Sequence, residues 1–307
     1  MSVVVVTGGA GFIGSHVVDH FVKKGCEVRV VDNLLTGKLE NLNESMSKIK
    51  FFKLDICNYD EILKVFKGSD FVIHLAALPS VPRSIKDPRT SHINNVLGSL
   101  SVFDAAKEAG VKKVVYASSS SVYGDTEELP KHEGMIPRPK SPYALQKYMC
   151  ERYANYFADN YPCDFIGLRF FNIFGPRQNP NSEYAAVIPK FIKLAKEGKQ
   201  ITIYGDGLAT RNFTYVENVV HAIDLACQSS GITGKVFNVA AGQEIFMNDL
   251  VLEIEKLIGK KLNVVHSPVR KGDIIRSFAD LTLAKKYLNF EVVVPFTMGI
   301  ERTEKSM

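Results

Sequence analysis

A tyrosine and a lysine stand four residues apart in the segment Tyr143-Ala144-Leu145-Gln146-Lys147. Positions i and i+4 share one face of a helix, and the preceding Ser141-Pro142 suits a helix start. An isolated phenol has a pKa of about 10 and is a poor base at neutral pH, but a nearby ammonium favours the phenolate. The pair therefore fits a base that takes a hydroxyl proton while hydride leaves the same carbon.

Four consecutive serines, residues 118–121, precede Val122-Tyr123-Gly124. They follow a predicted strand, so we expect their hydroxyls at the edge of a sheet where ligands bind. A serine there can hydrogen-bond the reacting oxygen and share its proton. The alternative, a Tyr/Lys pair on a solvated helix face beside a polar loop, remains open on these residues alone.

Glycines with three-residue spacing, Gly8, Gly11 and Gly14, lie between a β-branched run and an apolar helical pattern. This order is typical of a dinucleotide-binding turn, in which glycines allow a tight turn and close approach of a pyrophosphate. The following helix N-terminus offers free N–H groups and partial positive charge. Asp32 ends the second predicted strand, where its carboxylate suits the ribose of NAD and repels the extra phosphate of NADP. A plain structural turn with a surface aspartate is the alternative.

Short β-branched runs alternate with amphipathic segments through the first half of the chain. This alternation predicts an α/β fold with a doubly wound parallel sheet of the Rossmann type and a smaller mixed α/β substrate lobe. The predicted domains are 1–172 for NAD, with 208–242 returning to it, and 173–207 with 243–307 for a nucleotide sugar. Strands are expected at 3–6, 28–31, 51–55, 71–75, 113–117, 164–170, 200–204, 236–239 and 262–266. Helices are expected at 14–24, 59–66, 94–109, 143–160, 187–196, 216–227 and 248–258.

The 307 residues include 38 basic and 33 acidic side chains, with no long run of either sign. This mild excess argues against a nucleic-acid partner. No apolar run approaches the length of a membrane span, and the start is unlike a signal peptide. Five cysteines without a C-x-x-C pair favour free thiols, so we expect a cytoplasmic protein with no membrane partner and no metal.

Together these motifs resemble the extended short-chain dehydrogenase/reductase family, and within it the nucleotide-sugar 4-epimerases. The motifs T-G-G-A-G-F-I-G, H-L-A-A, S-S-S-S-V-Y-G, S-P-Y-A-L-Q-K and L-R-F-F-N-I-F-G-P-R occur in family order. The resemblance implies an isomerase that uses NAD and a UDP-sugar, and a homodimer formed by pairing of two long helices. It implies Ser119, Tyr143 and Lys147 as catalytic residues.

The residues and the resemblance together give two further sets of predicted site residues. The cofactor set is Gly8, Gly11, Phe12, Ile13, Gly14, Asp32, Asn33, Thr36, Gly37, Asp55, Ile56, Leu75, Ala76, Ala77, Asn94, Ser118, Tyr143, Lys147 and Phe170. The substrate set is Ser84, Ser119, Asn172, Val187, Thr202, Tyr204, Arg211, Arg270, Asp273 and Ser277. Arginines suit a diphosphate because the planar guanidinium grips phosphate oxygens bidentately.

The position of two serines narrows the reaction that the resemblance implies. Dehydratases of the family carry an acidic pair where this chain has Ser120 and Ser121, and its sugar-acid decarboxylases typically carry Glu at the second position. Epimerisation at carbon 4 is therefore favoured. Ser277 matches a position where epimerases restricted to glucose and galactose carry tyrosine, so N-acetylated sugars are expected to fit. UDP-glucuronate 4-epimerase, another nucleotide-sugar oxidoreductase and a non-enzymatic NAD sensor are the remaining alternatives.

Overall fold

A seven-stranded parallel sheet forms the larger part of the computed structural model, which describes residues 1–180, 186–269 and 276–307. All neighbouring strands of this sheet pair in parallel. In spatial order they are β11 (Val236–Val239), β6 (Asp164–Phe170), β5 (Lys113–Ser119), β4 (Phe71–His74), β1 (Val3–Thr7), β2 (Glu27–Val31) and β3 (Ile49–Phe52). The predicted doubly wound α/β class is confirmed.

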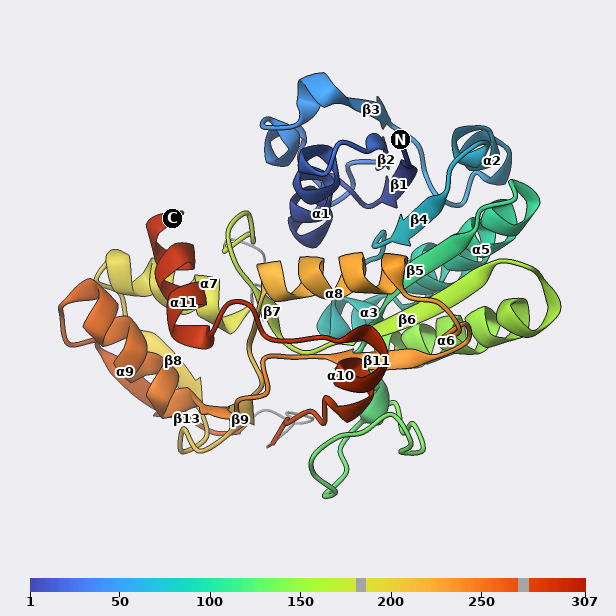
Figure 1. Cartoon of the computed structure of the whole chain (residues 1–307). Helices are drawn as coiled ribbons and strands as arrows, with labels where there is room; N and C mark the ends of the chain where they lie inside the picture. Colours follow the sequence, from blue (N-terminus) through green and yellow to red (C-terminus); the bar gives the residue numbers. More distant parts are fainter. Residues whose placement is uncertain (181–185, 270–275) are drawn as a thin grey trace.

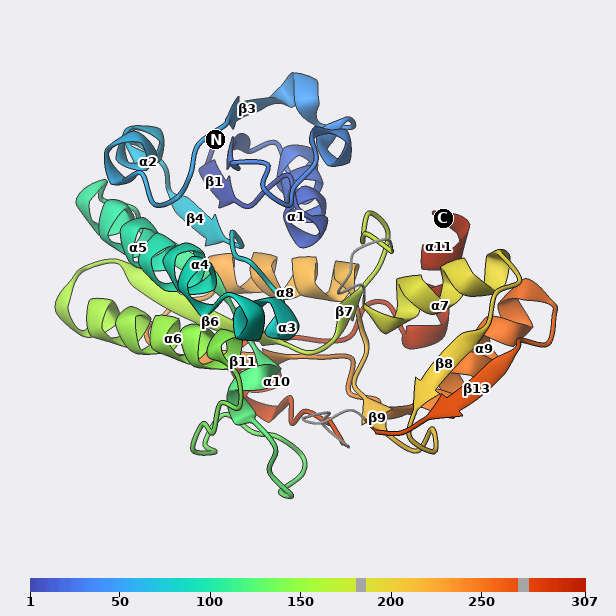
Figure 2. The same cartoon turned by 180° about the vertical axis from the view of Figure 1, so that it is seen from behind.

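Helices cover both faces of the sheet (Figures 1 and 2). One face carries α1 (Phe12–Lys23), α8 (Val216–Gln228) and α10 (Thr282–Leu288). The other carries α2 (Tyr59–Phe66), α5 (Gly98–Glu108) and α6 (Pro142–Asn160). Val4 and Val6 of β1 enter the first core while Val5 enters the second, so the strand is apolar without interruption.

A smaller lobe lies beside the sheet and holds a third core (Figure 1). Its helices are α7 (Val187–Lys196), α9 (Met247–Ile258) and α11 (Phe296–Lys305). Its strand pairs are β8 (Ile201–Tyr204) with β13 (Val264–Ser267), and β9 (Thr210–Arg211) with β12 (Ile245–Phe246). The pair β7 (Ile173–Phe174) and β10 (Thr214–Tyr215) leads from the sheet into this lobe. The predicted domain bounds themselves stay a prediction.

Short helical turns complete the chain. The segment between β4 and α5 contains α3 (Val81–Lys86), α4 (Pro88–His92) and a π-helical turn, η3 (Ile93–Leu97). The 3-10 turns are η1 (Leu39–Leu42), η2 (Met46–Lys48) and η4 (Ser120–Tyr123). The helix expected over 94–109 is present as α5, but it begins later because the π-helical turn occupies Ile93–Leu97. The strand expected at 51–55 is also shifted, to 49–52, where it pairs with β2.

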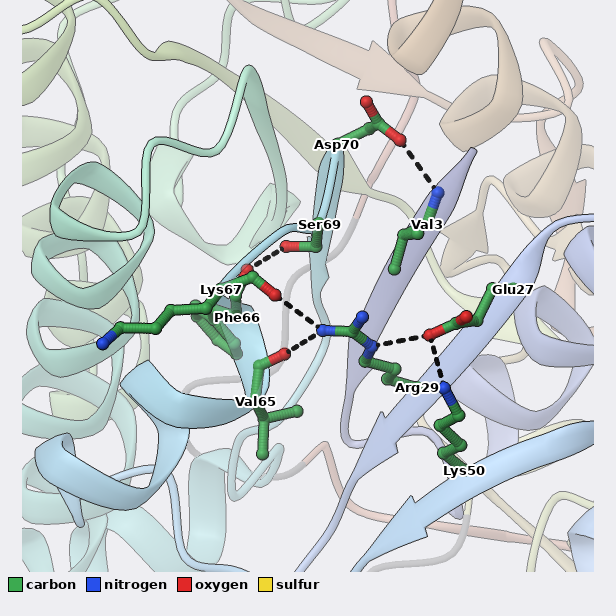
Figure 3. A network of polar contacts seen from close by, with 9 residues as sticks. All are labelled: Val3, Glu27, Arg29, Lys50, Val65, Phe66, Lys67, Ser69 and Asp70. Atoms are coloured by element: carbon green, nitrogen blue, oxygen red, sulfur yellow. Dashed lines mark hydrogen bonds and ion pairs between the residues drawn. The ribbon is translucent and has the colours of Figure 1, made fainter. Parts of the chain in front are cut away.

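Arg29 ties strand β2 to the end of helix α2 (Figure 3). Its guanidinium donates to the Val65 and Lys67 carbonyl oxygens, each at 2.8 Å, and to Glu27 at 2.9 Å. These carbonyls belong to the last helical turn, where intrahelical partners run out. The network thus has a structural role, and the carboxyl ends of the strands remain for ligands. Among the described residues, no helix is both long and apolar enough to cross a bilayer.

Candidate active site

A cavity of about 670 Å³ lies where strands β1 and β4 end. The chain order reverses between these two neighbours, and a crevice at such a switch point is where doubly wound sheets bind ligands. Most of the predicted cofactor residues line it: Gly8, Gly11, Phe12, Ile13, Gly14, Asp32, Asn33, Thr36, Ile56, Leu75, Ala76, Ala77, Asn94, Ser118, Tyr143, Lys147 and Phe170. Ser119 and Asn172 of the substrate set line it as well.

The glycine turn packs so tightly that side chains have no room. A Cβ on Gly14 would lie 2.1 Å from the Gly8 carbonyl oxygen, and one on Gly8 would lie 2.6 Å from the Ala76 nitrogen. Gly8 also has a φ of +71°, which favours glycine. No side chain of the described residues caps α1 at Gly11, so its first N–H groups face the cavity without a capping partner. This cradle fits the diphosphate of a dinucleotide.

Asp32 is almost fully buried at the wall of the cavity. Its carboxylate accepts hydrogen bonds from the Ala10 and Leu34 N–H groups at 3.0 and 2.8 Å. Burial raises the pKa of Asp32, while these hydrogen bonds oppose the rise. The adjoining Gly37 and Asp55 do not line the cavity: Gly37 packs against the Asp32 carboxylate, and Asp55 accepts a bond from Asn33 at 2.9 Å.

Tyr143, Lys147 and Ser119 meet at one side of the cavity. Ser141 caps α6 by accepting a hydrogen bond from the Ala144 N–H at 3.2 Å, and Pro142 opens the helix. This start places the tyrosine and the lysine one turn apart. Ser119 ends β5, and its hydroxyl oxygen accepts bonds from the Ser121 N–H and hydroxyl at 3.2 and 2.9 Å.

Burial raises the pKa of Tyr143 to about 12, and a hydrogen bond with Ser119 opposes the rise. Burial also lowers the pKa of Lys147, whose ammonium donates to the Ala117 carbonyl oxygen at 2.9 Å. The lowering of the phenol's pKa expected from this ammonium is therefore not seen, because desolvation dominates at Tyr143. A positive charge bound in the cavity would favour the phenolate.

A buried ion pair between α6 and β6 was not predicted from the sequence. Glu151 of α6 makes two bonds to Arg169 of β6, at 2.9 and 2.8 Å, and both side chains are at most 5% exposed. Glu151 also accepts a 2.5 Å bond from Ser118, while Arg169 stacks over the Tyr123 ring at 4.7 Å. Glu151 therefore joins the helix of Tyr143 to β6 through Arg169, and to the end of β5, the strand that carries Ser119, through Ser118.

We expect Glu151→Gln to lower the free energy of unfolding by about 3–5 kcal/mol, because Arg169 would remain buried without its countercharge. Urea unfolding monitored by circular dichroism measures this loss. Glu253→Gln is the matched control, since Glu253 pairs with the largely exposed Lys256 and should cost less than about 1 kcal/mol. Equal losses for the two variants would contradict the role given to the buried pair.

The π-helical turn directs Asn95 inward, away from the helix surface. Its carboxamide oxygen accepts from the Leu78 N–H at 2.7 Å, and its nitrogen donates to Gln146 of α6 at 2.8 Å. The Asn95 carbonyl accepts from Ser99, whose hydroxyl oxygen lies 2.9 Å from a ring nitrogen of His74. This network connects the end of β4 to α6 beneath the cavity.

His74 is buried between Thr7 and Ser99, and burial lowers its pKa to about 3. The unfolded chain takes up a proton near pH 6.5 and the folded chain only near pH 3, so stability falls as the pH drops between those values. We expect His74 to account for about 1.4 kcal/mol of stability lost between pH 8 and pH 5.5.

Urea unfolding at pH 8, 6.5 and 5.5 tests this expectation with His74→Asn and, as a control, the exposed His266→Gln. The His74→Asn protein should lose less stability over this range than the unmodified protein, whatever its starting value. His266→Gln should retain the original pH slope. An unchanged slope in His74→Asn would contradict the assignment.

The remaining predicted substrate residues that the structure describes are not among those that line this cavity. Thr202 and Tyr204 are on β8 and Arg211 on β9, while Val187 opens α7 directly after the cavity-lining Ala186. Ser277 is 7% exposed, and Ser84 is fully buried with its hydroxyl bonded to the Tyr143 N–H and the Val81 carbonyl. Arg270 and Asp273 lie outside the described residues. Their roles in substrate binding stay predictions.

Other residues line the cavity without having been assigned. Ser80 and Arg83 come from α3 and its cap, and Gln178 and Asn179 follow β7. The buried carboxamide oxygen of Gln178 has no hydrogen-bond partner among the described residues. An unpaired acceptor that faces a cavity suits a hydroxyl or amide donor of a ligand. Gln178 directly follows the motif L-R-F-F-N-I-F-G-P-R, whereas in α3 only Ser84 had been predicted as a site residue.

Comparisons with known proteins agree with this site. The model of the NAD dependent epimerase/dehydratase family matches residues 4–240. The chain is 38% identical over 303 residues to a UDP-glucose 4-epimerase of Mycolicibacterium smegmatis, covering 97% of this chain and 96% of that protein. It is similar to the structure of a UDP-N-acetylglucosamine 4-epimerase from Methanobrevibacter ruminantium M1 in complex with UDP-N-acetylmuramic acid. That likeness has 41% identity, a TM-score of 0.95 and coverage of 99% and 97% of the two chains.

A UDP-glucose 4-epimerase of Thermus thermophilus, solved in complex with NAD, is 34% identical with a TM-score of 0.90 over 99% and 98% of the chains. The chain belongs to the NAD dependent epimerase/dehydratase family. The predicted cofactor, NAD, and the predicted enzyme class, an isomerase, are confirmed by this membership and by the 4-epimerases among its relatives.

Proposed function

We propose that this protein is a UDP-hexose 4-epimerase that acts on UDP-glucose and UDP-galactose and also on UDP-GlcNAc and UDP-GalNAc. The meeting of Ser119, Tyr143 and Lys147 at the cavity that the glycine turn borders carries the proposal. The related UDP-glucose and UDP-N-acetylglucosamine 4-epimerases support both substrate classes. UDP-glucuronate 4-epimerase is the second candidate, because a Thermodesulfobacterium geofontis enzyme of that name is 34% identical.

In the proposed reaction, Tyr143 takes the proton of the sugar's 4-hydroxyl and Ser119 hydrogen-bonds the same oxygen. NAD, which the glycine turn and Asp32 would hold, would supply the acceptor for the hydride of carbon 4 and the donor that returns it to the opposite face of the ring. Lys147 holds positive charge beside the phenol and is fixed by Ala117. The 4-keto sugar turns about its link to the diphosphate between the two steps, and Tyr143 then gives the proton back. Serines in place of an acidic pair at Ser120 and Ser121 disfavour water elimination.

Parallel assays with UDP-glucose, UDP-GlcNAc and UDP-glucuronate test the choice of substrate. The product should be the 4-epimer of the first two sugars, separated by chromatography, with no net reduction of NAD. Conversion of UDP-glucuronate alone would favour the second candidate. Net reduction of NAD with any of the three would indicate a dehydrogenase instead.

Ser277→Tyr should slow conversion of UDP-GlcNAc more than that of UDP-glucose, because a bulky ring at this buried position leaves less room for an N-acetyl group. The expected change in the ratio of the two kcat/KM values is about 10–200-fold. Using the ratio cancels any general loss of folded enzyme. Equal slowing of both substrates would show that Ser277 does not select for sugar size.

A homodimer and a cytoplasmic location belong to the same proposal. Exposed apolar side chains on neighbouring helical segments support pairing between two copies: Ile93, Leu97, Leu145, Tyr153 and Tyr156. Five free cysteines are consistent with a reducing compartment. Sedimentation equilibrium measures the mass, and Leu97→Glu combined with Tyr156→Glu should give monomers.

A further inference from the structure

The chain that leaves the sheet after β6 forms one wall of the cavity. Asn172, Ile173, Gln178 and Asn179 line the cavity from this wall, which we call the 172–179 segment. The glycine turn and the first turn of α1 form another wall of the same cavity. A ligand that occupies the cavity therefore lies against both the 172–179 segment and α1.

The 172–179 segment has a strained backbone. Asn172 has a φ of +39° and Arg177 a φ of +67°, both in the left-handed region. Asparagine tolerates this region, but for arginine the conformation is costly and persists only where surrounding contacts enforce it. The contacts that hold Arg177 should therefore be identifiable.

Two contacts join the segment to α1. The Arg177 guanidinium forms an ion pair with Asp19 at 2.7 Å, and a longer one with the exposed Glu44 at 3.3 Å. A ring nitrogen of His16 lies 3.0 Å from the Pro176 carbonyl oxygen. Both α1 residues come from the helix that begins at the glycine turn, so the two walls of the cavity are tied together.

Asp19 is well placed as an anchor. It is 6% exposed, and its other carboxylate oxygen accepts a 2.5 Å hydrogen bond from the buried Ser45. Its orientation is thus fixed independently of Arg177. An ion pair with a fixed, largely desolvated partner contributes more than a pair between two mobile surface side chains.

We propose that Arg177 is a positioning residue whose ion pair with Asp19 holds the 172–179 segment against α1 and thereby slows the release of NAD. Retention of the cofactor suits a reaction that returns hydride in every cycle, and in this respect the inference rests on the proposed function. Neither Arg177 nor Asp19 lines the cavity, so both act through the walls that they join. Weakening the ion pair lets the 172–179 segment move without removing a side chain that faces the ligand.

The test measures NAD release from the full chain without any sugar present. Protein loaded with a fluorescent etheno-NAD is mixed with excess NAD, and the fluorescence change gives the release rate. Arg177→Gln and Asp19→Asn should each release the cofactor roughly tenfold faster, in line with coupling between contacting residues. The double variant should be no faster than the faster single variant. Lys305→Gln is the matched control, because Lys305 pairs with the exposed Glu301 within α11, neither residue lines the cavity, and the rate should stay unchanged.

Wild-type release rates in Arg177→Gln and Asp19→Asn, or additive effects in the double variant, would overturn the proposal. If Arg177→Gln fails to fold, Asp19→Asn and Arg177→Lys decide the question, since each keeps the local shape while weakening the pair. Melting temperatures of the cofactor-free variants separate a loosened wall from a general loss of stability. The release rate does not depend on sugar chemistry, so a failed epimerase assay leaves this test intact.

Discussion

Tyr143→Phe is expected to lower kcat by about 10²–10⁴-fold, the range found when a positioned acid or base is removed. The change deletes one oxygen and leaves a ring of the same shape at the start of α6. Coupled measurement of UDP-glucose conversion gives kcat, and equilibrium titration gives the affinity for NAD. That affinity should stay within a few-fold of wild type.

Tyr148→Phe is the matched control for this variant. Tyr148 lies on the same helix and does not line the cavity, so loss of its hydroxyl should leave kcat almost unchanged. Near-normal turnover in Tyr143→Phe would reject the phenol as the base. Loss of both turnover and NAD binding would instead indicate damage to the cavity.

Gly14→Ala should abolish measurable NAD binding and destabilise the protein by about 1–3 kcal/mol, the cost typical of forcing extra atoms into a packed site. Alanine in a helix is normally favoured over glycine by about 1 kcal/mol. Here the added Cβ would lie 2.1 Å from the Gly8 carbonyl oxygen and 2.8 Å from the Gly9 Cα, so the backbone must shift. The steric term therefore outweighs the gain in helix propensity.

Gly11→Ala separates the role of the glycine turn in NAD binding from its role in the stability of the fold. Its Cβ would meet only the Gly8 oxygen, at 3.1 Å, so the fold should tolerate it. We expect near-normal urea stability with weakened NAD binding, because the methyl group stands where a diphosphate approaches the backbone. A Gly14→Ala protein as stable as wild type and able to bind NAD would contradict the tight packing of the turn.

Local sequence spacing was enough to predict the parts of the site that lie within one strand–turn–helix unit. These parts are the glycine turn, Asp32 and the pair Tyr143 and Lys147. Each was predicted from residues close together in the chain, and each lines the cavity. The parallel sheet was also predicted from local sequence. Its strands are buried on both faces and read as apolar runs.

Contacts between distant segments were beyond this kind of prediction. The sequence around Asn95 has an ordinary helical pattern, which gave no sign of a π-helical turn. That turn directs Asn95 inward, where it bonds to Leu78 and to Gln146 of another helix. The Glu151–Arg169 pair joins a helix to a strand with no common motif. Helices α10 and α11 were also not predicted.

The direction of one pKa shift also required the structure. The sequence indicated a phenol made more acidic by a lysine, whereas burial of Tyr143 raises its pKa to about 12. The ammonium of Lys147 donates a hydrogen bond to the backbone oxygen of Ala117. A positive charge bound in the cavity is therefore expected to favour the phenolate of Tyr143.

Nuclear magnetic resonance of UDP-GlcNAc incubated with the enzyme in D₂O tests the central claim most directly. We expect the product to be UDP-GalNAc in which carbon 4 still carries its original hydrogen, with NAD oxidised at the end as at the start. Hydride that moves only between sugar and cofactor cannot exchange with solvent. Deuterium at carbon 4 of the product would contradict the account.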